Sequence, residues 1–365
     1  MHDPIDPRIL IKEITQLQEN EYQVVYISKN EPRLDAFQQI IKETIGEYNS
    51  ISGRFITSFI KPLPKIWKHR DARLFHYHDP ELYFVAIFAR ILGMKTIFDM
   101  HEDVPSQILT KTWLPKSIRS TFSKIYAFFE KFIVRTVSQV VTVTPPIQKR
   151  IGMENAILIR NFPIKGELIT PKDQLIPYKD RDDNIIYVGQ ASPYRGLDIM
   201  FDYLTSIKHK FSNFYFLGTI IPDSKTEYYK KQPIWEKTTY IHPATREQIK
   251  EYLNLSKIGL VLLPDTANNR LGYSTKLFEY MTAGLPVIVS NLPLNAGIVQ
   301  EHNCGIIIDL NDEKEFINAV DTLLSNPELA QKMGEAGKRA VLSNYCWEHE
   351  GQQLLNLYNS LLKNG

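Results

Sequence analysis

The chain has 365 residues, of which 43% are hydrophobic and 23% are charged, so two sizeable cores can be buried. A formal net charge of +2 excludes a strongly basic protein built to bind nucleic acid. Two cysteines, Cys304 and Cys346, are too few for a disulfide framework and match no metal motif, so we expect reduced thiols.

The first 20 residues predict no export signal. Charged side chains interrupt them where a signal peptide needs an apolar core. No uncharged apolar run in the chain approaches the roughly 20 residues of a membrane-spanning helix. We therefore expect a cytoplasmic protein, attached at most to the inner face of the cell membrane.

Short apolar runs alternate with segments of helical period along the chain, after a first helical pattern at 9–17. The runs are apolar on both faces, as in parallel strands covered by helices on each side. Their alternation with helices indicates βαβ units. The predicted strands are 24–27, 74–77, 96–98 and 140–143, followed by 185–188, 214–217, 258–262, 286–289 and 305–308.

The strand series breaks between Pro163 and Asp183, where prolines and a charged run predict a linker. We interpret Asp180 and Asp182 there as solvated charge. The predicted organisation is a Rossmann-like domain at 1–165, a linker at 166–183, a second Rossmann-like domain at 184–340, and a helix at 341–365 that returns to the first domain.

No strand precedes the helical pattern at 9–17, although a doubly wound half normally begins with a central strand. We therefore expect an N-terminal sheet that lacks its first strand. Either the recorded start lies downstream of the true one, or another segment fills the gap.

A glycine-rich turn follows the run at 185–188 and leads into a helical pattern. Gly189 and Gly196 would let backbone N–H groups approach an anion, and the helix N-terminus adds positive potential. Arg195 offers a charge-assisted contact to a phosphate. A turn that only packs strand against helix is the alternative.

The segment 270–286 carries the stronger pattern. Ser274 and Thr275 are natural N-caps of a helix that Gly284 ends. Lys276 and the free N–H groups at the helix start would bind a diphosphate. Glu279 lies one turn further on the same face, where its carboxylate would accept hydrogen bonds from ribose hydroxyls. The alternative is a helix whose Lys and Glu face solvent.

These patterns resemble the retaining GT-B glycosyltransferases of family 4, also called group 1, in the branch that assembles bacterial polysaccharides such as capsule and exopolysaccharide. The similarity spans nearly the whole chain and is most specific at 274–286. It implies an α/β GT-B fold, with two Rossmann-like domains facing a cleft. The stretches that carry it are 6–10, 78–82, 98–102, 187–189, 195–196, 274–286 and 345–348.

The resemblance implies a role for individual residues. Arg195 and Lys276 would meet the donor diphosphate, Glu279 would bind the ribose, and 240–243 would receive the base. His101 would point at the transferred sugar, so the implied catalytic residues are His101, Arg195 and Lys276. The implied donor-binding residues are Gly189, Gln190, Arg195, Tyr240, His242, Ser274, Thr275, Lys276 and Glu279. The acceptor-side candidates are His2, His78 and Glu102.

Two positions depart from the family pattern. Gln190 stands where many members have a second basic residue, and Leu271 stands where many have a glutamate that contacts the sugar. The donor-sugar contact is therefore open, with Asn268, Asn269 or the backbone of 270–275 as substitutes.

His78 and His101 each follow a predicted strand and adjoin carboxylates in the sequence. A carboxylate neighbour fixes the tautomer of a histidine and raises its basicity. Each histidine is either a sugar contact or a structural hydrogen-bonding residue. Neither has a third ligand at zinc spacing, so we expect no metal.

The segment 111–135 combines six basic residues with interleaved aromatic ones and a single acid, Glu130. A basic helix with aromatics can lie in a lipid headgroup layer. A helix that packs its apolar side on the core and exposes a basic side is the alternative.

The sequence thus predicts a glycosyltransferase of hexosyltransferase type that needs no cofactor and no metal. Its donor is a nucleotide-sugar, with a UDP-sugar favoured, and its acceptor is a glycan or a lipid-linked glycan. Arg195, Lys276 and helix-terminal amides would stabilise the charge that develops on the departing diphosphate. The alternatives are a nucleotide-sugar epimerase of the same fold and a catalytically degenerate nucleotide-binding scaffold.

Overall fold

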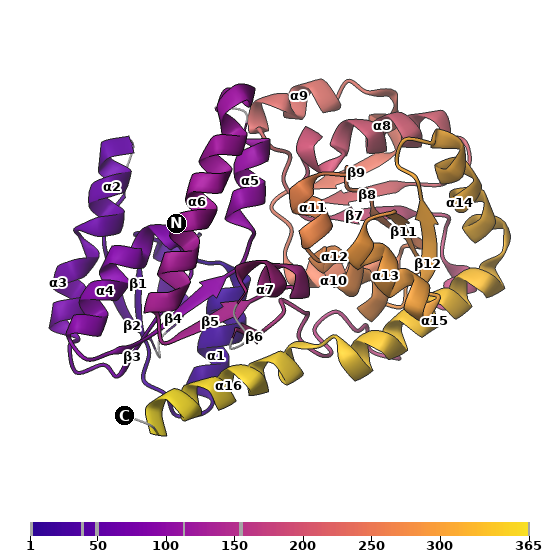
Figure 1. Cartoon of the computed structure of the whole chain (residues 1–365). Helices are drawn as coiled ribbons and strands as arrows, with labels where there is room; N and C mark the ends of the chain where they lie inside the picture. Colours follow the sequence, from indigo (N-terminus) through magenta and orange to yellow (C-terminus); the bar gives the residue numbers. More distant parts are fainter. Residues whose placement is uncertain (1–2, 38–39, 48–50, 112–113, 153–155, 364–365) are drawn as a thin grey trace. The chain divides into compact units, whose positions relative to one another are not determined.

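The computed structural model describes residues 3–37, 40–47, 51–111, 114–152 and 156–363 (Figure 1). The chain forms two compact units, each of the α/β class. The N-terminal unit comprises 1–161 and 347–365, and the C-terminal unit comprises 162–346. The segment 166–183 belongs to the C-terminal unit, and the helix α16 (Trp347–Lys363) belongs to the N-terminal unit.

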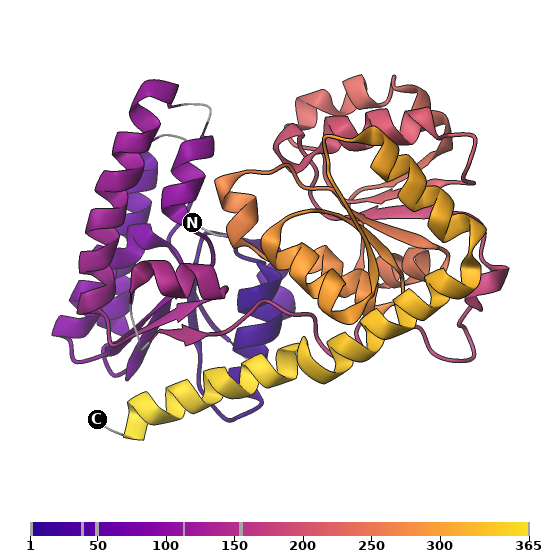
Figure 2. The same cartoon turned by 45° about the vertical axis from the view of Figure 1, so that its right-hand side comes forward.

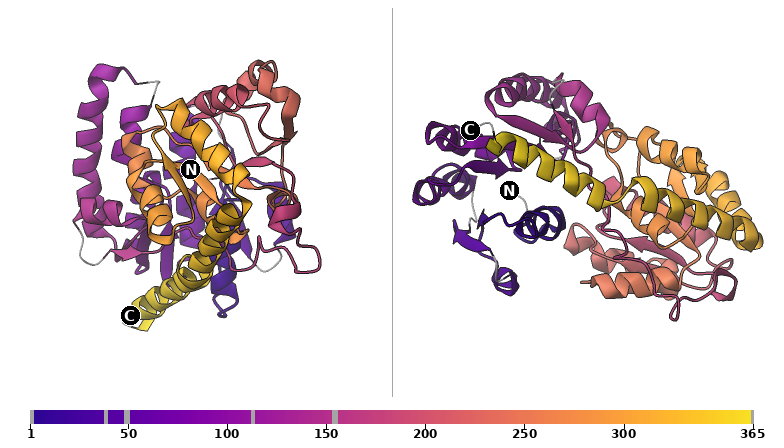
Figure 3. Two further views of the ribbon diagram at one scale, coloured as in Figure 1. Left: turned by 90° about the vertical axis from the view of Figure 1, so that its right-hand side faces the viewer. Right: turned by 90° about the horizontal axis from the view of Figure 1, so that it is seen from below.

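All strand pairs in the N-terminal unit are parallel, but the strands form two separate sheets. One sheet pairs β1 with β2, and the other has the order β3-β4-β5-β6. The β1–β2 ribbon stands apart from β3–β6 in the right-hand view of Figure 3. The strands are β1 (Val25–Ser28), β2 (Ile41–Thr44), β3 (Leu74–Tyr77), β4 (Lys95–Met100), β5 (Gln139–Thr142) and β6 (Ile157–Leu158).

The strands predicted at 24–27, 74–77, 96–98 and 140–143 match β1, β3, β4 and β5, whereas β2 and β6 were not predicted. β2 carries charged residues in the sequence Ile-Lys-Glu-Thr, and β6 has only two residues, so neither gives an apolar run. No strand precedes the first helix among the described residues, as expected.

The helices of the N-terminal unit cover both of its sheets. A π-helical stretch, η1 (Arg8–Ile14), runs directly into α1 (Thr15–Gln18), and α16 packs against both. The remaining helices are α2 (Ile51–Phe59), α3 (Pro62–Lys68), α4 (Tyr83–Ile91), α5 (Val104–Thr110), α6 (Lys116–Thr136) and α7 (Pro145–Ile151).

The C-terminal unit contains one continuous six-stranded parallel sheet in the order β12-β11-β10-β7-β8-β9. All four residues of β7, β8, β10 and β11 are buried, which explains their apolar runs. The strands are β7 (Ile185–Val188), β8 (Phe214–Leu217), β9 (Thr238–Ile241), β10 (Ile258–Val261), β11 (Val287–Ser290) and β12 (Gly305–Ile308).

Helices cover the two faces of this sheet (Figure 2), and an apolar core lies on each face. One core is formed with α8 (Leu197–Ser206) and α14 (Glu313–Ser325). The opposite core is formed with α10 (Arg246–Asn254), α12 (Thr275–Thr282), α13 (Pro293–His302) and α15 (Pro327–Asn344). The short helices α9 (Thr226–Tyr229) and α11 (Ala267–Leu271) complete the unit.

Both units are therefore Rossmann-like, as the sequence predicts, and the carboxyl ends of their parallel strands are where such sheets bind ligands. None of the described helices is both long and apolar enough to cross a membrane.

Candidate functional site

The turn after β7 depends on two glycines with left-handed backbone conformations. Gly189 has φ 102° and Gly196 has φ 78°. A Cβ atom at Gly196 would lie 2.4 Å from the carbonyl oxygen of Leu262, so no other residue fits there without movement. These glycines hold the backbone of the turn close to the neighbouring strand ends.

Lys276 lies beside this turn. Its side chain is largely buried at 8% exposure, and its Nζ lies 4.8 Å from the centre of the Tyr187 ring, within the range of a cation–π contact. Its Cε lies 3.9 Å from where a Cβ of Gly189 would stand. The predicted partners Lys276 and Gly189 are thus neighbours.

Arg195 also contacts this turn, from the end of the 3₁₀ turn Pro193–Arg195. Its exposed guanidinium lies 3.4 Å from the carbonyl oxygen of Gln190, which also accepts a 2.9 Å hydrogen bond from the hydroxyl of Tyr187. Lys276 thus lies near Gly189, and Arg195 lies near Gln190.

The start of α12 adds backbone donors. Ser274 is the N-cap residue but makes no side-chain cap bond, and its own N–H donates to Oδ1 of buried Asn295 at 2.9 Å. The N–H groups of Thr275 and Lys276 make no hydrogen bond to any described residue. These two amides, rather than that of Ser274, are open to a ligand.

Glu279 forms an ion pair with Arg246, which the sequence did not predict. Its Oε1 accepts a 2.8 Å hydrogen bond from Nη1 of Arg246, and Arg246 also makes a two-pronged pair with Glu167. Partial burial lowers the pKa of Arg246, but the two carboxylates outweigh this effect and raise it. Arg246 opens α10 directly after a capping box formed by Thr245 and Gln248, and that sequence signal would have located it at a helix start.

Tyr240 and His242 lie together at the end of β9. Their ring centres are 6.3 Å apart with an angle of 26° between the planes. Nδ1 of His242 lies 3.2 Å from Oγ1 of Thr219. Two flat faces next to a strand end suit a nucleobase.

The N-terminal unit carries a cluster of histidines and carboxylates at the ends of β3 and β4. Nδ1 of His78 lies 2.9 Å from Nε2 of His101, and this Nε2 lies 3.4 Å from Oδ1 of Asp99. Nε2 of His78 lies 3.6 Å from Oε2 of Glu13. The two predicted histidines are therefore in contact, and they share carboxylates that the sequence interpretation did not assign to them.

Arg8 organises this cluster from the first helix. Its guanidinium pairs with Asp99 at 2.8 Å and with Glu13 at 2.9 Å, and all three side chains are buried. Burial raises the pKa of Asp99, but Arg8 and His101 outweigh this effect and hold it well below its usual value. Burial raises the pKa of Glu13 well above its usual value. The two carboxylates that Arg8 contacts therefore have pKa values shifted in opposite directions.

Donor atoms of Glu13, His76, His78 and Asp99 all lie within 4.8 Å of one another, a spacing that could hold a metal ion. Arg8 already supplies a positive charge to both carboxylates of this set. The donor set therefore fits an ion-pair network better than a cation site.

Glu102 and Asp103, which adjoin His101 in the sequence, are engaged elsewhere. Glu102 is exposed and accepts a hydrogen bond from Gln107, while Asp103 caps α5. The spacing of Asp99, in β4, and His101, directly after β4, was the signal for the true neighbour, since residues two apart in an extended chain share a face. His2 lies outside the described residues.

Two family models match the chain and together cover both units. The model described as "Glycosyl transferases group 1" matches residues 171–340, and the model described as "Glycosyltransferase Family 4" matches residues 9–153.

Several proteins are similar to parts of the chain. Spore coat protein SA of Bacillus subtilis is 34% identical over 82 residues, 22% of each chain. The uncharacterized glycosyltransferase MJ1178 of Methanocaldococcus jannaschii is 23% identical over 241 residues, 64% of this chain and 63% of that protein. The chain thus matches less than two thirds of the length of these relatives.

Solved structures match over nearly the full length. Sucrose-phosphate synthase of Thermosynechococcus elongatus superimposes with a TM-score of 0.76 at 16% identity, covering 96% of this chain and 92% of that one. Anabaena Alr3699/HepE, solved in complex with UDP and glucose, superimposes with a TM-score of 0.74 at 12% identity, covering 99% and 97%. These similarities show the fold.

Proposed function

We propose that the chain is a glycosyltransferase of the group 1 and family 4 type, and that it transfers a sugar from a nucleotide-sugar donor with retention of configuration. The two family models, which match different units, and the GT-B fold support this proposal. The proposed donor is a UDP-sugar and the proposed acceptor is a glycan or lipid-linked glycan. Anabaena HepE, which shares the fold, was solved with UDP and glucose.

A single arrangement carries the proposal: two cations lie near Gly189 and Gln190, beside the open amides of α12. When the glycosidic bond to a nucleoside diphosphate breaks, negative charge collects on the β-phosphate. Lys276, Arg195 and the amides of Thr275 and Lys276 would stabilise that charge without reorganising.

Glu279 would bind the ribose hydroxyls while keeping its pair with Arg246. A carboxylate has two oxygens and about four acceptor positions, and Arg246 uses Oε1. The pair would orient the carboxylate before the nucleotide arrives, which reduces the ordering cost of binding.

The proposed enzyme needs no metal, because protein cations face the diphosphate. We expect full transfer activity after dialysis against EDTA, with no gain from added Mg²⁺ or Mn²⁺. Loss of activity that either ion restores would contradict this part of the proposal.

We also propose that α6 binds an anionic membrane surface, where a lipid-linked acceptor would be found. Phe122, Ile125, Phe128, Phe129 and Phe132 are 50% to 73% exposed, so they do not fill the core. Lys116, Arg119, Lys124, Lys131 and Arg135 lie on the same helix, and its acid Glu130 is buried against Arg150. Basic charge around exposed aromatics matches an interfacial helix.

Calorimetric titration with UDP, GDP, ADP and dTDP tests the donor site. We expect selective binding of one nucleotide, and Lys276→Ala should weaken it by about 1–3 kcal/mol, roughly 5- to 150-fold. Lys208→Ala is the matched control, because Lys208 lies just beyond the C-terminal end of α8, is 41% exposed and pairs with the exposed Glu236 at 3.3 Å. Equal affinity of the Lys276→Ala protein and the parent would contradict the site.

Product analysis separates transfer from the two alternatives. A transferase incubated with donor alone releases free sugar slowly, whereas an epimerase returns an isomerised nucleotide-sugar. A scaffold binds the nucleotide and changes nothing. Leu271 and Gln190 make this test necessary, since both replace residues that many family members use.

A further inference from the structure

The gap between the two N-terminal sheets is bounded by the unpaired edge of β1. β1 bonds to β2 through alternate residues: Ile41 N–H donates to Val24 at 3.1 Å, and the register continues two residues at a time. The peptide groups of Val25 and Ile27 therefore face away from β2. They bond to no described residue on that side.

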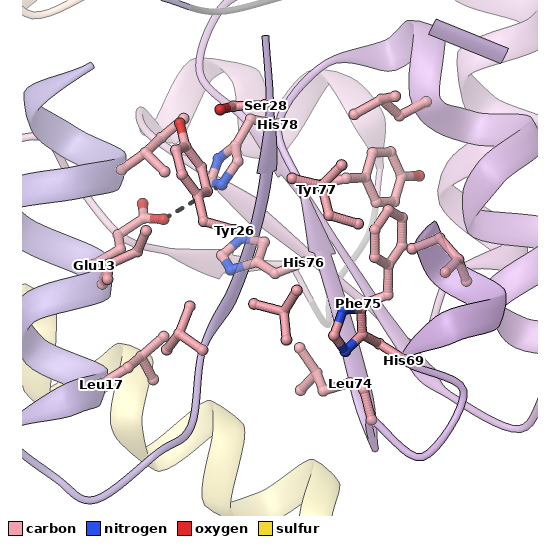
Figure 4. Close-up of a pocket in the computed structure, with 18 of the residues that line it drawn as sticks. Glu13, Leu17, Tyr26, Ser28, His69, Leu74, Phe75, His76, Tyr77 and His78 are labelled. Carbon is pink, nitrogen blue, oxygen red and sulfur yellow. Dashed lines mark ion pairs between the residues drawn. The ribbon is translucent and has the colours of Figure 1, made fainter. Parts of the chain in front are cut away.

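The opposite side of the gap is the unpaired edge of β3. Lys95 N–H donates to the carbonyl of Arg73 at 2.9 Å, so alternate residues of β3 bond to β4. The peptide groups of Leu74 and His76 face the gap, and no described residue pairs with them. In Figure 4 both strands run in the same direction, with Ser28 and His78 at one end of the gap and Leu74 near the other.

A cavity of about 460 Å³ occupies this gap, which we call the strand slot, between β1 and β3. Helix residues Ile9, Ile14 and Leu17 line it, as do Ile66 and Leu82 from the α3–α4 side. Tyr26 packs with the η1 core on one face, and Ile27 packs with the α3–α4 core on the other. Side chains therefore cover both faces of the slot, and the unpaired backbone edges of β1 and β3 form its two sides.

The strand order of the C-terminal sheet indicates what kind of segment fits the strand slot. Numbered along the chain, the strands of that sheet lie in the order 6-5-4-1-2-3, with the first strand β7 in the centre. A strand in the slot would give the N-terminal unit the order β2-β1-slot-β3-β4-β5-β6. If the slot strand is counted as the first, this order reads 3-2-1-4-5-6-7, which is the order of the C-terminal sheet with β6 added at one edge. The helix from Arg8 to Gln18 would then correspond to α8, which follows β7.

We propose that the strand slot binds one extended, apolar peptide strand, parallel to β1 and β3, which joins the two N-terminal sheets into one. The occupant has about four or five residues, since each residue of a strand spans roughly 3.3 Å and the slot follows strands of four residues. It is apolar on both faces, as β7 is, because helices cover both faces. Its backbone N–H and C=O groups form hydrogen bonds with the peptide groups of Val25 and Ile27 on one side, and with those of Leu74 and His76 on the other.

A synthetic peptide that copies residues 184–190, and therefore β7, is the probe. We expect it to bind the intact chain and to slow amide hydrogen exchange about tenfold or more at Val25, Ile27, Leu74 and His76. The amides of Tyr26 and Phe75 should not change, because the alternation already directs them to β2 and β4. Failure of the peptide to bind up to about 1 mM, or binding that leaves the four amides unprotected, would overturn the proposal.

Two controls test the backbone pairing. The same peptide with Ile186→Pro lacks an N–H donor and should not protect the slot. In the protein, Ile27→Pro removes a donor that faces the slot, whereas Lys42→Pro removes one on the outer edge of β2, so only the first should prevent binding. If Ile27→Pro does not fold, the proline peptide still decides the question.

A second copy of the chain is the competing occupant. Sedimentation at rising protein concentration, without peptide, distinguishes it. Self-association that protects the same four amides would assign the slot to a second copy and overturn the proposal.

Discussion

The sheet of the C-terminal unit and the two sheets of the N-terminal unit are buried to different degrees. All four positions of the central strand β7 are buried, whereas three of the four positions in β1 and in β3 are only partly buried. β7 is paired on both sides, and β1 and β3 each have one unpaired edge among the described residues. Similar apolar sequences therefore reach full burial only where a neighbouring strand completes the ladder.

The units also differ in what holds their helices to the sheet. Apolar cores on both faces hold the C-terminal helices. In the N-terminal unit the first helix is tied to β4 by the buried Arg8 and Asp99, and Nη1 of Arg8 also donates to the carbonyl of Ile159 at 3.0 Å. An ion-pair network thus provides part of the attachment that apolar cores provide in the C-terminal unit.

Removal of Arg8 should have the largest effect. Arg8→Ala leaves the buried Asp99 carboxylate without its cation, which should cost about 3–5 kcal/mol of N-terminal unit stability. Native-state hydrogen exchange at the amides of β4 measures this unit separately from the C-terminal one.

Arg33→Ala is the matched control for that experiment. Arg33 pairs with Glu31, but its side chain is 66% exposed, so water screens the pair and we expect no measurable change in stability. An equally small change for Arg8→Ala would show that apolar contacts alone hold the first helix.

Added volume in the closed C-terminal sheet should have the next largest effect. A Cβ atom at Gly259 would lie 2.5 Å from the ring of buried Tyr280, so Gly259→Val should cost about 3 kcal/mol. The hydroxyl of Tyr280 accepts a 2.8 Å hydrogen bond from the N–H of Val188, next to Gly189, so nucleotide affinity should fall as well.

Gly297→Ala provides the contrast within the same unit. Nothing lies within 4 Å of a Cβ at Gly297, and alanine favours the helix, so this variant should gain up to about 1 kcal/mol. Urea unfolding of the two variants compares them. A stable Gly259→Val protein with unchanged nucleotide affinity would show that Tyr280 can move freely.

Glu13 and Asp99 should make the stability of the N-terminal unit depend on pH in opposite directions, and this effect should be smaller. Glu13 has a raised pKa in the folded protein. Its contribution to the free energy of unfolding is therefore complete below its ordinary pKa of about 4.3, and it is lost as the pH rises through the pKa of the folded protein. Asp99 has a lowered pKa, so its contribution is present above about 3.9 and is lost as pH falls.

Glu13→Gln mimics the protonated carboxyl. Relative to the parent, it should gain stability as pH rises through that window, by at most about 1.4 kcal/mol per pH unit. Unfolding of the N-terminal unit by urea between pH 4 and pH 8 measures the slope. A difference that does not vary with pH would mean that Glu13 is ionised in the folded protein.

The sequence predicted what depends on local pattern. The C-terminal strands other than β9 follow from apolar runs, and the helix start near Ser274 follows from its N-cap pattern. β9 (Thr238–Ile241) was not predicted, because Thr238 and Thr239 interrupt its apolar run. The partners of the candidate site residues were not predictable. Arg246 reaches Glu279 from 33 positions away, and Arg8 reaches Asp99 from 91 positions away, because tertiary packing alone brings them together.

The smallest expected effect tests the strand slot directly. Leu74 lines the slot and is partly buried, so Leu74→Phe adds volume where about 460 Å³ is open and should change stability by less than about 1 kcal/mol. Ile258 starts β10, which is fully buried, so Ile258→Phe adds similar volume where none is open and should cost about 2–3 kcal/mol. Thermal unfolding compares the pair. Equal destabilisation by both would mean that a strand already fills the slot, and the peptide should then fail to bind. Tolerance of Leu74→Phe alone would mean that the difference between the N-terminal and C-terminal units lies in that open space.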